Sequence, residues 1–204
     1  MGEELLSLGI NTNLAPVLDL GDARTFLGNR IWGQKPEEVT ERTIKFIQGL
    51  KSAGVFPVAK HFPGHGGSRT DAHFKMPVIR KSYARLWNED LKPFADAIKD
   101  DLPALMTAHV EVPAVDQGPA SLSAKFLQDV LRRQLGFRGL VITDDLEMGG
   151  VFAESGGLVE DAALKAFKSG TDQLLVVWSD KSKEKILSKL LFLLSKKKIE
   201  NYYG

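Results

Sequence analysis

The stretch that decides the fold is Leu140-Val-Ile-Thr-Asp-Asp-Leu146, a short apolar run that ends in two adjacent carboxylates. A run of this kind is typical of a strand that is buried on both faces of a parallel sheet. The segment before it, residues 123–135, has helical spacing and stops at Gly136. This order of helix, strand and polar strand end predicts one unit of an α/β fold.

The same rhythm recurs along the chain. Further strands are predicted at residues 14–18, 55–59, 104–108 and 173–178, and further helices at residues 37–52, 83–98, 159–168 and 181–197. Strands that recur after helices indicate βαβ units and a parallel sheet.

Two parallel architectures compete, an open doubly wound sheet and a (β/α)8 barrel. No Gly-x-Gly-x-x-Gly follows the first strand, so the dinucleotide-binding form of the open sheet lacks its fingerprint. Polar residues instead follow the strand ends, where the active sites of barrels lie. They are Asp19, Lys60-His61, His109 and Asp144-Asp145. We therefore predict an α/β fold of the (β/α)8 TIM-barrel type.

The barrel is expected to be incomplete. A full barrel has eight strands and about 250 residues, whereas only five strands are predicted in these 204 residues. Residues 3–8 look like the end of a helix whose strand would lie upstream. We predict one partial domain over residues 1–204 that lacks its N-terminal units, which upstream sequence or another chain would supply.

Composition narrows the choice of partners. The 27 basic and 26 acidic side chains give a net charge of +1, so nucleic acid and anionic membranes are not expected partners. Cysteine is absent, which excludes a disulfide framework and a thiolate nucleophile. No signal peptide or apolar span is visible, and we predict a cytoplasmic protein.

The densest group of reactive side chains follows the second strand, in Lys60-His-Phe-Pro-Gly-His-Gly-Gly. It continues to Asp71-Ala-His73, where a carboxylate two residues from an imidazole could fold back onto it and make it a proton donor and acceptor. Taken alone, the pair favours a simpler interpretation, a turn-forming aspartate beside an exposed histidine.

Asp144 and Asp145 also allow two interpretations. A carboxylate at the rim of a barrel can attack an anomeric carbon, but an aspartate at a strand end also commonly caps the next helix. Neighbouring side chains point in different directions, so we expect one to face the site and the other to support the loop. By themselves, Arg30, His109 and Asp19 favour surface or structural roles.

The motifs KHFPGHG, D-x-H and ITDDLEM, preceded by NLAPVLDL and GNR, resemble glycoside hydrolase family 3, most closely its β-N-acetylhexosaminidase branch. The resemblance implies a retaining glycosidase on a (β/α)8 barrel that uses no metal and no cofactor. It implies a small carbohydrate substrate with terminal β-linked N-acetylglucosamine, such as a muropeptide or a chitooligosaccharide.

The resemblance also implies roles for single residues. Asp144 would be the nucleophile, His73 the acid/base, and Asp71 the partner of His73. The substrate-binding residues that it implies are Arg30, Lys60 and His61.

The chain departs from the family pattern in two ways. Ala72 stands where the branch usually has serine or threonine, and no acidic-Gly-Gly-Arg segment for the terminal sugar is present. The alternatives are an inactive fragment that binds only sugar or a partner, and another β-glycosidase of the same family. A metal-dependent hydrolase is a weaker alternative, because the histidines do not follow a standard ligand spacing.

Overall fold

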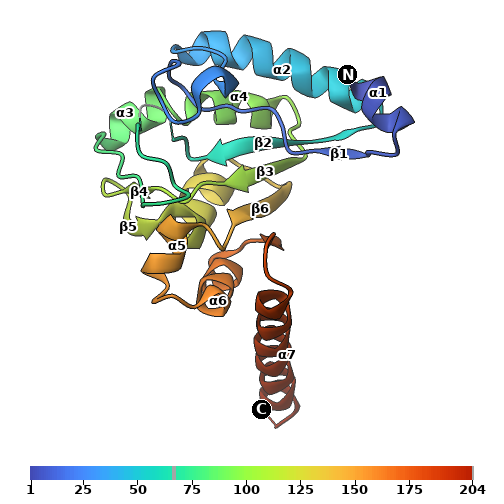
Figure 1. Cartoon of the computed structure of the whole chain (residues 1–204), viewed down its shortest axis with the longest axis vertical. Helices are drawn as coiled ribbons and strands as arrows, with labels where there is room; N and C mark the ends of the chain where they lie inside the picture. The colour runs from blue at the N-terminus through green and yellow to red at the C-terminus, as the bar shows by residue number, and fades with distance from the viewer. Residues whose placement is uncertain (66–67, 204) are drawn as a thin grey trace.

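The structure is a computed structural model that describes residues 1–65 and 68–203. Its centre is a five-stranded sheet in which neighbouring strands are all parallel (Figure 1). The strands follow the order β1 (Thr12–Asn13), β2 (Phe56–Phe62), β3 (Ala104–Thr107), β6 (Leu140–Asp145) and β7 (Gln173–Leu175). This arrangement is half of a (β/α)8 barrel and confirms the predicted fold class.

Helices connect the strands and cover the outside of the sheet (Figure 1). The α-helices are α1 (Gly2–Ser7), α2 (Pro36–Ser52), α3 (Tyr83–Asn88), α4 (Lys92–Lys99), α5 (Gly149–Glu154), α6 (Val159–Ser169) and α7 (Asp180–Tyr203). A π-type helix, η3, spans Lys125–Gln134, and short 3₁₀ helices lie at Gly28–Arg30 and Ala120–Leu122.

Alternation along the strands gives the sheet two apolar faces. Ala59, Leu105 and Val141 belong to a large cluster with the covering helices. Val58, Met106 and Ile142 belong to a second, smaller cluster. Successive strand residues point to opposite faces, so the row of Val58 continues to Lys60, and the row of Ile142 continues to Asp144. The sheet thus carries a cation and a carboxylate on one face, near the ends of two strands.

The first strand, β1, lies just before the predicted segment 14–18, so the predicted bounds were wrong. The segment 14–18 forms only an isolated bridge, from Val17 to Lys60, because Pro16 has no N–H to give to a ladder. The segment still runs beside β2, since Lys60 N donates to Pro16 O and Leu18 N donates to Lys60 O. Its path carries Asp19 to the carboxyl end of β2.

The predicted helix 83–98 is two helices, α3 and α4. Pro93 lies in the first turn of α4, where its missing N–H and fixed φ start a new helix and do not continue the previous one. Asp90, at the junction, is almost fully buried.

Other differences lie after β3 and around β7. The antiparallel pair β4 (Glu111–Val112) and β5 (Asp116–Pro119) was not predicted, nor was α5. The strand β7 ends at Leu175, before the predicted residue 178. There the backbone N–H of Val177 donates to the Asp145 carboxylate and that of Trp178 to Glu147, so side chains replace the ladder.

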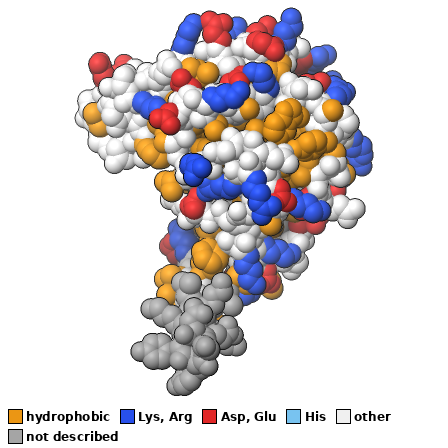
Figure 2. Space-filling view, turned by 180° about the vertical axis from the view of Figure 1, so that it is seen from behind, with side chains coloured by type: hydrophobic (Ala, Val, Ile, Leu, Met, Phe, Trp, Pro, Cys, Tyr) orange, Lys and Arg blue, Asp and Glu red, His pale blue; other side chains and the backbone are white. Residues whose placement is uncertain are grey.

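Helix α7 extends away from the body of the molecule (Figure 1). Ile186 packs against α6, whereas Leu187 and Leu191 are exposed. Figure 2 shows hydrophobic side chains where this helix leaves the body of the molecule. Within the described residues, no helix has the length and apolar character needed to cross a membrane.

Candidate active site

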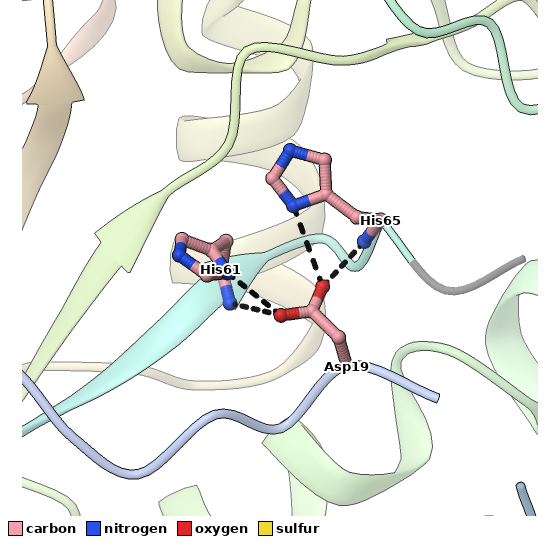
Figure 3. Close-up of side chains that lie close together, drawn as sticks. All are labelled: Asp19, His61 and His65. Atoms are coloured by element: carbon pink, nitrogen blue, oxygen red, sulfur yellow. Dashed lines mark hydrogen bonds and ion pairs between the residues drawn. The ribbon is translucent and has the colours of Figure 1, made fainter. Parts of the chain in front are cut away.

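A buried carboxylate, Asp19, organises the carboxyl end of β2 (Figure 3). Its Oδ2 accepts from the His61 backbone N–H at 3.1 Å and contacts His61 Nδ1 at 2.7 Å. Its Oδ1 accepts from the His65 backbone N–H at 2.5 Å. Burial would raise the pKa of Asp19, but these bonds and the two imidazoles hold it well below its usual value. Asp19 is therefore an anion that fixes the backbone at His61 and His65.

The same three residues offer ligand atoms within 4.8 Å of one another, as a metal site would. Each oxygen of Asp19 already accepts a backbone N–H, however. These bonds hold the three residues together as a hydrogen-bonded cluster.

Gly64 lets this segment turn beside Asp90. Its φ is +114°, and a Cβ at this position would lie 3.0 Å from the Cβ of Asp90. Asp90 also accepts from Lys81 Nζ at 2.6 Å. Both ends of the loop that carries Asp71 and His73 thus meet on one buried side chain. Residues 66–67 of the glycine-rich stretch lie outside the described residues.

Asp71 and His73 form the pair that the sequence suggested. Asp71 Oδ1 contacts His73 Nδ1 at 2.7 Å and accepts from the His73 backbone N–H at 2.9 Å. Burial would raise the pKa of Asp71, but these bonds to His73 lower it on balance. The carboxylate therefore stays charged and orients an imidazole whose side chain is 61% exposed.

The loop of this pair is docked beside the end of β6. Gly149 N donates to His73 O at 2.9 Å, and Gly150 N donates to Ala72 O at 3.1 Å. A Cβ on Gly149 would lie 2.6 Å from His73 O, so only glycine permits this approach. Ala72 is fully buried in an apolar cluster with Leu146, which suits a methyl group where the branch usually has a hydroxyl.

Asp144 and Asp145 end β6 and have different surroundings. Asp145 is buried, and its Oδ1 accepts from Glu147 N and Val177 N, so it supports the loop. Asp144 is partly exposed, and its Oδ1 accepts from Asp145 N at 2.8 Å. Burial would raise the pKa of Asp144, but the His61 and His109 imidazoles and this N–H lower it. Asp144 is thus a charged carboxylate that is partly exposed to solvent.

His109 is a buried structural side chain that contacts the backbone of Asp145. Its Nδ1 lies 2.7 Å from Ser121 Oγ and its Nε2 lies 2.9 Å from Asp145 O. A carbonyl oxygen only accepts, so Nε2 carries the hydrogen and Nδ1 accepts from the serine. Burial lowers the pKa of His109 to about 4. The neutral ring joins β3 to the end of β6.

Lys60 shares this face of the sheet with Asp144, and Arg30 lies on the long loop after β1. Burial and the nearby Arg30 guanidinium lower the pKa of Lys60, whereas Asp144 and Asp19 oppose that shift. The charges of Arg30 and Asp144 are thus both near enough to Lys60 to affect its pKa. The sequence singled out all three, but it missed the roles of Asp19 and His65. The signal for Asp19 was its place directly after a strand, which alone favoured a structural interpretation.

A half-barrel with carboxylates, imidazoles and a lysine at the carboxyl ends of its strands has the architecture on which (β/α)8 enzymes build their active sites. Comparison with known families narrows this class. The glycosyl hydrolase family 3 N-terminal domain matches residues 1–201, and the chain belongs to that family.

Individual relatives agree with this assignment. A beta-hexosaminidase of Nitrosospira multiformis is 39% identical over 93% of this chain and 54% of its own length. A family 3 beta-N-acetylglucosaminidase from Paenibacillus has a similar structure, with a TM-score of 0.92 and 36% identity over 96% of this chain and 38% of that one. NagZ from Neisseria gonorrhoeae, solved in complex with N-trifluoroacetyl-D-glucosamine, has a TM-score of 0.76. It is 36% identical over 86% of this chain and 50% of its own chain. The chain spans about half the length of the curated relatives it matches.

Proposed function

We propose that the chain carries the catalytic groups of a retaining glycosidase that removes terminal β-linked N-acetylglucosamine from muropeptides or chitooligosaccharides. The observation that carries this proposal is the docking of the loop of the Asp71–His73 pair on Gly149 and Gly150, in the segment that follows β6 and Asp144. Membership of family 3 and the N-acetylglucosamine analogue bound by a relative support the choice of sugar.

In the proposed reaction, the Asp144 carboxylate attacks the anomeric carbon while the His73 imidazolium protonates the departing glycosidic oxygen. The bond from the anomeric carbon to that oxygen breaks, and an ester to Asp144 forms. His73 then takes a proton from water, whose oxygen attacks the same carbon and releases Asp144. Asp71 holds the imidazolium during the first step. Arg30, Lys60 and His61 would bind the sugar hydroxyls.

The test is turnover of a chromogenic β-N-acetylglucosaminide. It compares the 204-residue chain with a chain extended upstream, because the relatives are longer. Asp144→Asn should abolish turnover in any active form, since it removes the nucleophile. Asp180→Asn is the matched control, because Asp180 is an exposed aspartate at the start of α7. Full activity of Asp144→Asn would refute the proposal.

A second candidate is a sugar-binding chain without turnover, and the chain's coverage of only about half of its relatives favours it. Binding of N-acetylglucosamine in saturation-transfer NMR, with no turnover by either chain length, would establish this alternative. Turnover that survives exhaustive chelation would separate the glycosidase from a metal-dependent hydrolase.

A further inference from the structure

A polar hollow that contains none of the proposed catalytic residues lies among the loops of the sheet. It is a cavity of about 290 Å³ between the loop after β1, the start of α2, the loop that carries His73, and the end of α3. Its lining residues include Asp22, Arg24, Gln34, Arg69, Lys81 and Glu89. None of them has a role in the proposed glycosidase reaction.

Three cationic side chains, Arg24, Arg69 and Lys81, contribute to the wall of this cavity from two loops. The opposing carboxylates already have partners. Asp22 accepts from Arg24 Nε at 3.0 Å, and Glu89 accepts from Lys81 at 3.0 Å and also pairs with Arg85. The acids therefore do not offer the cavity an unpaired negative charge.

Arg69 differs from Arg24 and Lys81, which each pair with a carboxylate. Within residues 1–65 and 68–203, no carboxylate lies within ion-pair distance of its guanidinium. It is near enough to Asp22 to help lower the pKa of that carboxyl, after the larger effect of Arg24. A planar guanidinium with free donors in a polar hollow is the group that proteins use most to bind carboxylate and phosphate.

The start of α2 adds to the positive potential. Gln34 and Pro36 line the cavity, and the residue before the helix, Lys35, makes no capping side-chain bond. The first N–H groups of a helix carry a partial positive charge. Glu37 and Glu38 in the first turn oppose it, and Arg24 and Lys81 are paired with carboxylates, so the main attraction comes from Arg69.

We propose that this cavity binds a small oxyanion, a carboxylate or phosphate group, held chiefly by Arg69, with Arg24 and Lys81 in the same wall. A bound anion would join the loop that carries Arg30 to the loop that carries His73, because Arg24 and Arg69 lie on these two loops. The site goes beyond the proposed glycosidase activity and does not depend on it.

The test is an NMR titration of the full chain with inorganic phosphate and, separately, with acetate, at fixed pH and ionic strength. Fixed ionic strength removes general screening as a cause of the shifts. We expect saturable shifts of amides around the cavity. Arg69→Gln should weaken binding by about tenfold or more, as expected for loss of a charge-assisted hydrogen bond. Arg80→Gln is the matched control, an exposed arginine near the end of the same loop that does not line the cavity.

The outcomes divide clearly. Saturation with phosphate alone identifies a phosphate site, saturation with acetate alone identifies a carboxylate site, and both outcomes support the proposal if Arg80→Gln binds like the wild type. Shifts that rise without saturation, or equal weakening in both variants, would overturn it. Lys81→Met should also weaken binding. Unchanged amide shifts far from the cavity would show that each variant is folded.

Discussion

Replacing Asp19 by asparagine tests the framework of the site without requiring activity. The carboxylate accepts the backbone N–H groups of His61 and His65 and contacts the His61 ring. Asparagine keeps the shape but replaces one oxygen by an NH₂ group, which then faces a donor. A hydrogen bond to a charged group contributes about 1.5–3 kcal/mol, and a buried unpaired donor costs about 1–3 kcal/mol. We expect the free energy of unfolding to fall by about 2–4 kcal/mol.

The assay is urea unfolding at pH 7, followed by tryptophan fluorescence. Asp22→Asn is the control, because Asp22 lies three residues away in a solvent-exposed ion pair with Arg24. We expect a clearly lower midpoint for Asp19→Asn and a wild-type midpoint for Asp22→Asn. Equal midpoints for the wild type and both variants would refute the reasoning that Asp19 holds the segment in place.

The same substitution has a pH signature. Because the pKa of Asp19 is lower in the folded chain than in the unfolded one, its stabilisation is complete above about pH 5. It is lost as the pH falls through about 4 toward the folded value. The difference in unfolding free energy between wild type and Asp19→Asn should therefore shrink on acidification. A difference that stays constant over this interval would contradict the lowered pKa.

Three further predictions concern other parts of the site. Gly149→Ala places a Cβ 2.6 Å from the carbonyl oxygen of His73, so the free energy of unfolding in urea should fall by about 1–3 kcal/mol. Gly49→Ala is the control on α2, where a Cβ would meet open space, and it should be neutral or stabilising. A larger loss for Gly49→Ala would contradict the docked loop. The ring of His109, with its pKa of about 4, should stay neutral during acidification until well below pH 6 in ¹⁵N NMR; a midpoint near 6.5 would argue against its burial. In an active form, Asp71→Asn should lower kcat by about 10²-fold while the urea midpoint stays unchanged, and an unchanged kcat would show that Asp71 does not assist His73.

Much of the fold could be predicted, because buried parallel strands leave a strong signal in sequence. The runs around Val58, Leu105 and Val141 are continuously apolar, and their ends carry the polar residues. The predictions of element bounds that failed depended on single backbone groups. Pro16 removed a ladder donor from the predicted strand at residues 14–18, and Pro93 divided one predicted helix into two.

The candidate site was harder to predict than the fold. The Asp71–His73 contact is local, so a spacing of two residues was enough to suggest it. The contacts of Asp19 with His61 and His65 join residues more than forty positions apart, and no periodicity in the sequence predicts such contacts. Docking of the loop on Gly149 depends on the absence of a side chain, which becomes informative only when the neighbouring carbonyl is located.

The central claim is that Asp144 and His73 act on one glycosidic bond. The most direct measurement is covalent trapping with 5-fluoro-N-acetylglucosaminyl fluoride, applied to the chain and to its upstream-extended form and followed by peptide mass mapping. We predict one added sugar on the peptide that contains Asp144 and none on Asp144→Asn. A sugar attached to another residue, or labelling of Asp144→Asn at the wild-type rate, would contradict the account.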